Sequence, residues 1–588
     1  MDRIVGCVGL PDALAPFLPG DPGTPGPTGR ALHQGAGWQC ATQGSYRSVE
    51  DDRFVVCVAG IPGSDSAGNN GVEHVADLCR RGGISALGAL GGNYAVVVVD
   101  KRDRRVHLQT DEYGSHSLYY AREAKRWYWG TSLRDVASVI RRPRLNRDGL
   151  VEALCFRILT DADTLLREVR QVRPGTLVSL TAGSEAAESP TPRLARHFSG
   201  TSDESVVSRL ARLEHALGES LVRLRRRCPA VTVFLSGGLD SSLLLAKTLE
   251  AGFSKVQCCT AVFPGWQNPE LPGARRVATR LGVPLDEVAV SHDDVERLFP
   301  CAVAAMEEPP RHYKIFALWK MYEYASKDAP VVISGIGAEN IFGPKVITSI
   351  RAAQRRLGQL ALVPALARRA LARALPRGAD GRLALLRNLS LCPDERALFT
   401  LLLLCDERLP QLRFAAGIPS VPEFPLSFWE SQVSGLAGME DRQQVFALLT
   451  EDRSDLQARA RIGGAFGVAT VHPFLEPEVM RLGASQPIHE RQRDGWSKPL
   501  LRMAAEKYFP RDWIYTRKFG FPTPLADWMS GPLRRWLTEL DEAAEVRHDV
   551  WRAGALRQAG RDGNLEVLWS AMTAEFLLKR YLDQAPGN

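Results

Sequence analysis

The stretch VFLSGGLDSS, residues 233–242, decides the fold of this chain. An apolar run leads into Ser236 and two glycines, and a helical pattern that ends at Gly252 follows directly. Glycines allow a backbone to pass close to a bulky anion, and the amides and dipole at the start of a helix attract negative charge. The stretch therefore predicts a strand, a phosphate-binding turn and a helix.

The same turn carries an acidic residue where a phosphate would approach. It lacks the lysine of the GxxxxGK[ST] loop, so it is not typical of ordinary kinases or GTPases. Asp240 would repel a bare phosphate, but a magnesium ion that bridges its carboxylate to the phosphates removes that repulsion. We therefore expect ATP or a related nucleotide to bind here together with Mg²⁺.

Strands and helices alternate after residue 205. Short apolar or β-branched runs are separated by segments with apolar residues at helical spacing. This alternation predicts a parallel sheet with crossover helices. The expected strands are 230–236, 255–263, 286–290 and 329–334.

The amino-terminal part has a different pattern. Residues 1 to about 180 contain apolar runs separated by Gly, Asp and Asn turns, which predicts a β-rich unit. Residues 181–205 are poor in large apolar side chains, which is typical of a linker. The sequence therefore predicts two domains, at 1–185 and 205–588, with a helical insertion at about 345–450 in the second.

Composition limits the possible classes of protein. The 588 residues are 45% hydrophobic and 24% charged, which are ordinary globular values. No apolar run approaches the roughly 18 residues of a membrane helix, and no secretion leader opens the chain, so we expect a cytoplasmic protein without membrane insertion. The 11 cysteines include no CxxC pair, and Cys258 and Cys259 are expected to be buried thiols. A net charge of +7 permits an anionic ligand and does not indicate nucleic acid.

One segment is strongly basic. Residues 351–387 contain nine arginines and a single acidic residue, Asp380. This pattern is typical of the solvated face of amphipathic helices. The alternative is a docking surface for an acidic peptide or a partner protein.

Several motifs resemble those of asparagine synthetases and β-lactam synthetases, which belong to the ATP pyrophosphatase group. These enzymes use ATP to adenylate a carbonyl oxygen and release pyrophosphate. The resemblance covers nearly the whole chain. The motifs are SGGLDS (236–241), VVISGIGAENIFG (331–343), HPFLEPEVMRLGASQP (472–487), WSKPLLRMAAEKYFPRDWIYTRKFGFPTPLADW (496–528) and, near the amino terminus, GALGGNYAVVVVDKRDRRVHLQTDEYGSHSLYY (88–120) and VRPGTLVSL (172–180).

The resemblance implies a fold for each domain. The amino-terminal domain would be a glutaminase-like α+β domain of the Ntn type, built as a β-sandwich. The carboxy-terminal domain would be an α/β domain with the parallel sheet of the ATP pyrophosphatase group and added helices.

The resemblance also implies a role for individual residues. In the relatives the second metal-binding carboxylate is an aspartate, and here its position is Glu339, which keeps the charge but adds a methylene. Lys518, in RKFGF, matches a lysine that stabilises the adenylate and the transition state for amide formation. The nucleotide site would be lined by Leu235, Val262, Ser334 and Gly335. The phosphates would be held by Ser236, Gly237, Gly238, Asp240 and Ser241. Mg²⁺ would be held by Asp240 and Glu339.

The chain also departs from these relatives. Glutamine-hydrolysing members expose a cysteine at position 2, whereas this chain has Asp2, a weak nucleophile, so no glutaminase activity is expected. Ile336 replaces the Glu or Tyr of the second glycine loop, and Ala469 and Thr470 stand where the relatives have an acidic residue. His472 is a conceivable weak base, with a structural role as the alternative.

These departures lead to three hypotheses. The first is a lasso peptide cyclase, which adenylates an Asp or Glu side chain of a precursor peptide and closes a macrolactam with the peptide's own amine. Its partners would be that peptide, a leader peptidase and a leader-binding protein. The second is a ligase for a small amino acid-like substrate, or one that uses free ammonia. The third is a non-catalytic regulator that keeps the nucleotide fold, against which the intact Asp240 and Lys518 argue.

Overall fold

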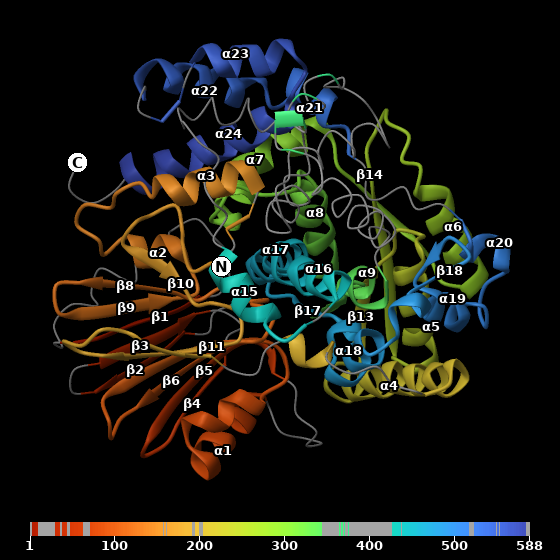
Figure 1. Ribbon diagram of the computed structural model, residues 1–588, viewed down its shortest axis with the longest axis horizontal. Helices are drawn as coiled ribbons and strands as arrows, with labels where there is room; N and C mark the ends of the chain where they lie inside the picture. The colour runs from red at the N-terminus through yellow and green to blue at the C-terminus, as the bar shows by residue number, and fades with distance from the viewer. Residues whose placement is uncertain are drawn as a thin grey trace.

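The amino-terminal part is a sandwich of two six-stranded antiparallel sheets (Figure 1). The computed structural model describes residues 3–9, 30–35, 38–43, 47–62, 71–156, 158–159, 161–190, 194–198, 204–343, 364, 366–367, 370, 374, 426–436, 438–516, 523–547, 550–551 and 553–583. The first sheet has the order β10-β8-β9-β1-β3-β2 and the second β12-β11-β7-β6-β5-β4.

The strands of the first sheet are β1 (Arg3–Val8), β2 (Arg30–Gly35), β3 (Trp38–Gln43), β8 (Tyr119–Glu123), β9 (Arg126–Gly130) and β10 (Val169–Gln171). Those of the second are β4 (Arg47–Glu50), β5 (Phe54–Pro62), β6 (Gly92–Asp100), β7 (Arg105–Thr110), β11 (Thr176–Thr181) and β12 (Ala187–Pro190). The associated helices are α1 (Gly71–Gly82), η2 (Ile84–Ala89), α2 (Leu133–Ala137), α3 (Arg147–Phe156) and η3 (Leu194–His197).

The two sheets enclose one apolar core because alternate side chains of each strand point inward. Ile4 and Trp129 of the first sheet and Val97 of the second belong to the same buried cluster. Helix α1 covers the outer face of the second sheet with Val72 and Val75. The β-rich unit expected from the sequence is therefore present.

The predicted linker is partly wrong. Residues 187–190 form the edge strand β12, which pairs antiparallel with β11, and η3 follows it. All four β12 side chains are exposed, so the strand needs no large apolar residues and its composition resembles that of a linker.

The carboxy-terminal part contains a parallel sheet in the order β15-β14-β13-β16-β17. Its strands are β13 (Ala230–Phe234), β14 (Lys255–Val262), β15 (Asp286–Ala289), β16 (Val331–Ile333) and β17 (Ala469–Val471). The four strands expected from the sequence are confirmed as β13 to β16. The fifth, β17, follows the described helices that come after the insertion.

Helices cover both faces of this sheet (Figure 1). On one face α4 (Val206–Arg227) and α5 (Leu239–Glu250) pack against Val231 and Cys258. On the other, α7 (His292–Met306), α8 (Ile315–Ala325) and α24 (Leu565–Leu578) belong to the cluster that contains Cys259. Both thiols are buried, as predicted. Among the described residues, no helix is both long and apolar enough to cross a membrane.

The remaining described elements of this part are α6 (Leu271–Leu281), α9 (Ala338–Phe342), α15 (Leu426–Val433), α16 (Met439–Ala447), the π-helical η4 (Leu448–Asp452), α17 (Arg453–Ala465), η5 (Pro473–Leu475), α18 (Pro477–Ala484), η6 (Ile488–Glu490), β18 (Gln492–Arg493), β19 (Trp496–Ser497), α19 (Pro499–Ala505), α20 (Arg511–Ile514), α21 (Leu525–Ser530), α22 (Arg534–Val546), α23 (Ala553–Arg561) and η7 (Lys579–Asp583).

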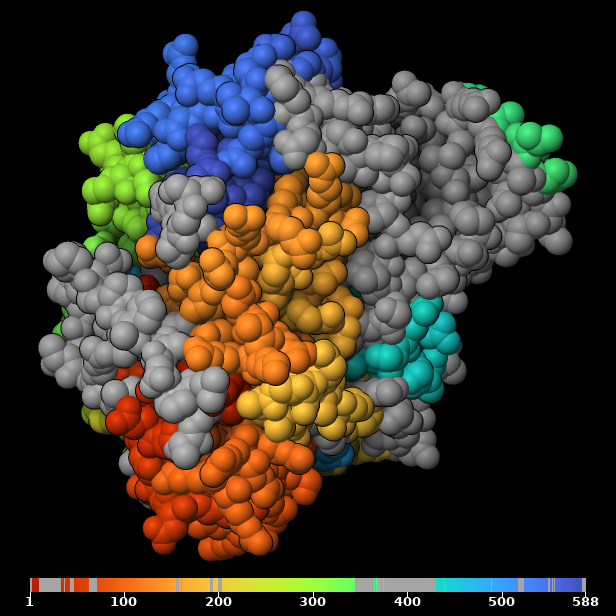
Figure 2. All heavy atoms as spheres, turned by 90° about the vertical axis from the view of Figure 1, so that its left-hand side faces the viewer, coloured from red at the N-terminus to blue at the C-terminus, as the bar shows by residue number. Residues whose placement is uncertain are grey.

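The two parts share a buried apolar cluster, and polar side chains of α17 add hydrogen bonds between them. Helix α3 also packs against α24, and the orange amino-terminal part adjoins the blue carboxy-terminal helices in Figure 2. The hydrogen bonds that α17 makes to the amino-terminal part are buried and directional. The α17 bonds run from Arg453 to the Gln171 side chain at 2.9 Å, from Gln457 to the Gly114 carbonyl at 2.9 Å and from Arg461 to the Ser117 hydroxyl at 2.8 Å.

Arg461 donates hydrogen bonds to both parts of the chain. Its guanidinium donates to the Met306 carbonyl and to the Glu308 carboxylate, at 3.2 Å, within its own domain. It also donates to the Tyr119 hydroxyl of the amino-terminal domain at 2.5 Å, in addition to Ser117. The side chain is almost fully buried.

We expect Arg461→Leu to lower the free energy of unfolding by about 3–5 kcal/mol, because it leaves the half-buried Glu308 carboxylate without its counter-charge. The midpoint of thermal unfolding, measured by calorimetry, should fall accordingly. Arg297→Leu is the control, since Arg297 is 61% exposed and pairs only across one helical turn with Asp294. Equal midpoints for the Arg461 variant and the wild type would contradict the prediction.

Candidate nucleotide site

The glycine turn between β13 and α5 has the geometry that its sequence predicts. Gly238 is the N-cap of α5, and no side chain caps the first amides of the helix. The Ser241 hydroxyl lies 3.2 Å from the Ser236 hydroxyl and donates to the Gly238 carbonyl at 3.2 Å. These bonds fix a turn whose amide groups can surround an anion.

Gly237 is required by a close backbone approach. Its φ of +73° lies in the left-handed region, and a Cβ there would lie 2.3 Å from the Ala274 amide nitrogen. Gly238 differs, because its φ is −78° and a Cβ would lie 3.3 Å from the Ser236 hydroxyl oxygen, the nearest atom. Only the first glycine therefore lets the start of α6 pack against the turn.

Two carboxylates meet at this turn. Asp240 lies in the first turn of α5 and Glu339 in the first turn of α9. The ammonium group of Lys498 lies 2.9 Å and 2.7 Å from the two Asp240 oxygens and 2.7 Å from a Glu339 oxygen. The two acidic residues expected to hold metal are therefore together, and a lysine bridges them.

Lys498 is charged although it is buried. Burial acts to lower its pKa, but the charges of Asp240 and Glu339, and its hydrogen bonds to them, outweigh burial and raise the pKa. Its backbone adopts a left-handed conformation, with φ 56°, directly before Pro499 and helix α19. This conformation is uncommon for a non-glycine residue and often marks a functional position.

Sequence reasoning missed Lys498. It lies within the quoted WSKPLL motif but 258 positions from Asp240 along the chain, and nothing in that motif indicates which strand end it reaches. A lysine directly before a proline at the start of a helix was the available signal.

The second glycine loop lies against the first. A Cβ on Gly335 would lie 3.3 Å from the Asp240 Cβ, so the loop after β16 contacts the start of α5. The Ser334 amide donates to the Val471 carbonyl of β17 at 3.0 Å, and the Leu235 amide donates to the Cys259 carbonyl of β14 at 2.9 Å. The residues expected to line the nucleotide thus lie at the carboxyl ends of neighbouring parallel strands, where ligands bind in such sheets.

His472 has a different environment from the one a general base needs. It is buried, and burial, with the nearby charge of Arg459, lowers its pKa well below the usual value. A neutral imidazole with so low a pKa accepts a proton poorly near neutral pH. The geometry favours a structural role.

Three sequence-based expectations fall outside the described residues. They concern Lys518, Asp2 and nearly all of the basic segment 351–387.

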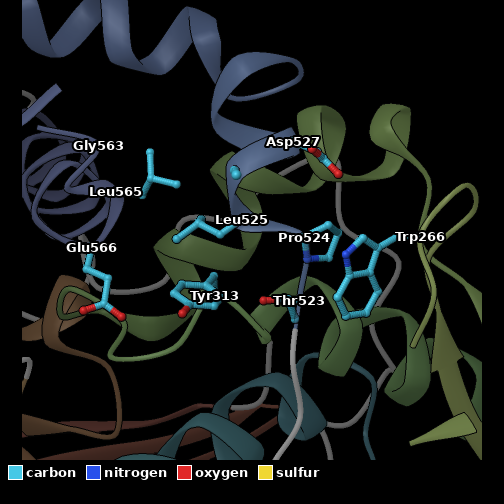
Figure 3. A pocket seen from close by; sticks show the side chains of 10 residues that line it. Trp266, Tyr313, Thr523, Pro524, Leu525, Asp527, Gly563, Leu565 and Glu566 are labelled. Atoms are coloured by element: carbon cyan, nitrogen blue, oxygen red, sulfur yellow. The ribbon is translucent and has the colours of Figure 1, made fainter. Parts of the chain in front are cut away.

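A cavity of about 360 Å³ is lined by Trp266, which follows β14, and by Thr523 and Pro524, which lead into α21. Trp266 and Pro524 lie next to each other on one wall, with Tyr313 and Leu565 on another (Figure 3). The described residues that line it include no basic side chain, and its wall of Trp266, Tyr313 and Leu565 suits an apolar group. The lining residues are Trp266, Tyr313, Thr523, Pro524, Leu525, Ala526, Asp527, Gly563, Leu565 and Glu566.

The carboxylates fit a magnesium ion that is shared with a nucleotide. Mg²⁺ usually takes one or two protein carboxylates and completes its coordination with phosphates and water. Asp240 and Glu339 supply such a pair, and the described residues contain no group of three or more His, Cys, Asp and Glu side chains that would make a complete protein site. The site therefore suits a nucleotide-bound metal ion rather than a resident one.

We expect Gly237→Ala to lower the free energy of unfolding by about 2–4 kcal/mol, because it combines a left-handed backbone with a clash against Ala274. Gly238→Ala is the matched control and should cost less than about 1 kcal/mol. Urea unfolding followed by circular dichroism measures both. Equal costs for the two glycines would refute the assignment of the close approach to Gly237.

We expect Lys498→Met to destabilise the protein by about 3–5 kcal/mol, because it removes the buried cation that bridges two facing carboxylates. Added Mg²⁺, without nucleotide, should restore part of the thermal midpoint of the variant and leave the wild type unchanged. Lys320→Met, which removes a partly exposed lysine of α8, is the control. If Mg²⁺ shifted all three proteins equally, the carboxylate pair would not be the ion's site.

Comparisons with known proteins agree with this geometry. The family described as Asparagine synthase matches residues 212–578, and the Glutamine amidotransferase domain matches residues 63–190. Asparagine synthetase [glutamine-hydrolyzing] 1 of Bacillus subtilis is 21% identical over 78% of this chain and 72% of its own length. A putative asparagine synthetase [glutamine-hydrolyzing] of Mycobacterium bovis is 23% identical over 83% of this chain and 76% of its own length.

Among solved structures, a glutamine phosphoribosylpyrophosphate amidotransferase from B. subtilis is 12% identical, with a TM-score of 0.21, over 49% of this chain and 65% of that one. This likeness is too weak to carry an argument. The Asparagine synthase match, in contrast, covers more than half of the chain. The chain therefore belongs to the asparagine synthase family of ATP-dependent amide ligases.

Proposed function

We propose that this chain adenylates an Asp or Glu side chain of a precursor peptide with ATP and then forms a macrolactam with the peptide's N-terminal amine, as a lasso peptide cyclase does. The observation that carries the adenylation step is the partly buried Asp240–Lys498–Glu339 arrangement beside the glycine turn. The choice of substrate rests on what the chain lacks compared with its relatives.

The adenylation chemistry follows from the charges at the turn. The uncapped start of α5 holds the phosphates, and the Lys498 ammonium stabilises negative charge that develops on the α-phosphate oxygens. Mg²⁺, when bound through Asp240 and Glu339, supplies the charge neutralisation that lets pyrophosphate depart. Lys518 would contribute a second cation.

The nucleophile must arrive with the substrate. Asp2 stands where a cysteine would release ammonia from glutamine, and a carboxylate is a poor nucleophile there. The positions that could deprotonate a hindered amide are apolar or engaged: Ile336 packs against the core, and the Thr470 hydroxyl lies 2.5 Å from that of Tyr322. A primary amine of a peptide has a pKa of about 8 and needs little help.

A second candidate is a ligase for a small substrate. The curated relatives carry the name asparagine synthetase, so aspartate with free ammonia, or a β-lactam precursor, is the alternative acceptor pair. The cavity beside Trp266 and Tyr313 favours the peptide, because aspartate has no apolar part to fill it. A leader peptidase and a leader-binding protein would act with the enzyme on a peptide.

Pyrophosphate release from ATP tests the proposal. We expect release with peptides that carry a free amine and one Asp or Glu, together with a product lighter by one water, and none with glutamine alone. Asp240→Asn should lower the rate at least about 100-fold, because it weakens both the metal site and the Lys498 pair. Release with aspartate and ammonia but with no peptide would replace the proposal by the second candidate.

A further inference from the structure

Arg459 of α17 reaches the second glycine loop from the side opposite the phosphate turn. Its Nε donates to the Ser334 hydroxyl at 3.1 Å. Its Nη1 is buried and, within the described part of the chain, has no hydrogen-bond partner. A buried guanidinium donor without an acceptor is costly, so its retention calls for an explanation.

The strand order places this guanidinium beside the acyl-transfer site. Strand β16 lies between β13, which leads into the phosphate turn, and β17, against which α17 packs. Ser334 follows β16 directly, and its neighbour Gly335 contacts Asp240. Arg459 therefore faces the phosphate site across the two residues Ser334 and Gly335.

Among the described residues, no acidic side chain accepts a hydrogen bond from the Nη1 of Arg459. Asp455 forms an ion pair with Lys314 at 2.6 Å and interacts with the charge of Arg459. Asp455 lies on the same face of α17, one turn before Arg459. Burial acts to raise the pKa of Asp455, but the charges of Lys314, His312 and Arg459 outweigh burial and lower it. Asp452, one further turn back, contacts Asn340 instead. In the part of the chain that the structure describes, Nη1 thus has no acceptor, and an external anion would supply one.

We propose that Arg459 binds the carboxylate of the acyl substrate and holds it for attack on ATP. A guanidinium and a carboxylate form paired, charge-assisted hydrogen bonds of matching geometry. In the step that follows, one carboxylate oxygen bonds to the α-phosphorus, the bond from that phosphorus to the bridging oxygen breaks, and pyrophosphate leaves with the electron pair. Arg459 keeps the attacking carboxylate ionised and in place. This role rests on the proposed adenylation function.

The carboxylate is favoured over a phosphate because the phosphates already have partners. The start of α5 and Lys498 lie on the β13 side of the second loop, and Arg459 lies on the β17 side. Arg459 as a whole residue is half-buried, and its Nη1 is buried beside the second glycine loop. Lys314, which pairs with Asp455, directly follows Tyr313 in the chain, and Tyr313 lines the cavity of Figure 3.

The test compares Arg459→Gln and Arg459→Lys with wild type and with Arg297→Gln, whose exposed arginine lies on α7. The first measurement is the Kd of α,β-methylene ATP with Mg²⁺, by calorimetry. The second is pyrophosphate release as a function of the concentration of an Asp-containing peptide with a free amine. L-aspartate with ammonia is the parallel acceptor pair.

We expect Arg459→Gln to raise the KM of whichever carboxylate substrate the wild type uses by about 10- to 100-fold, since a hydrogen bond to a charged group is lost. The Kd of the nucleotide analogue should change by less than about threefold, as for Arg297→Gln. Arg459→Lys should recover part of the KM, because it restores the charge without the paired geometry.

Each other outcome overturns a distinct claim. An equal loss of nucleotide affinity would make Arg459 a phosphate ligand. An unchanged KM would remove it from substrate binding. If aspartate and not the peptide drives release, the peptide proposal fails while the KM shift still tests Arg459; if neither carboxylate drives release, adenylation and the role of Arg459 fail together.

Discussion

The ion pair of Lys498 with Asp240 and Glu339 is the interaction on which the site depends. Two carboxylates brought together in a partly buried place repel each other, and only a cation between them makes the arrangement stable. The charges of the two carboxylates and of the lysine add up to one negative charge. A bound Mg²⁺ would change that sum to one positive charge, so the site would attract a triphosphate only together with its metal ion. This explains why an acidic residue can stand inside a phosphate-binding turn.

The parallel sheet brings the two carboxylates together. Asp240 and Glu339 follow β13 and β16, which are neighbours in the sheet although about a hundred residues separate them in the chain. Because the two strands are parallel, their carboxyl ends lie at the same edge of the sheet. Gly237 and Gly335 then let the turns after these strands contact α6 and α5. A bulkier residue at either place would move the carboxylates apart.

The sequence predicts what is local and misses what is remote. The helical and strand periods locate β13 to β16, and the glycine turn indicates its phosphate chemistry, because both depend on neighbouring residues. Lys498 could not be identified in this way, since its partners are set by the packing of α19 against α5. Strand β12 was missed because an exposed edge strand has no apolar period. Arg459 was missed because its role appears only when α17 lies against β17.

Helix α17 explains why a glutaminase-like domain without its cysteine is retained. At about 100° per residue, Arg453, Gln457 and Arg461 lie on one side of this helix, and Asp452, Asp455 and Arg459 lie roughly opposite. The first set binds the amino-terminal domain, and the second faces the second glycine loop and α8. Without the domain, Arg453 and Arg461 would lose the acceptors that it supplies, which include Gln171 and Ser117, and α17 would lose contacts that help to fix the position of Arg459. The domain is therefore needed to hold one wall of the site, whether or not it hydrolyses glutamine.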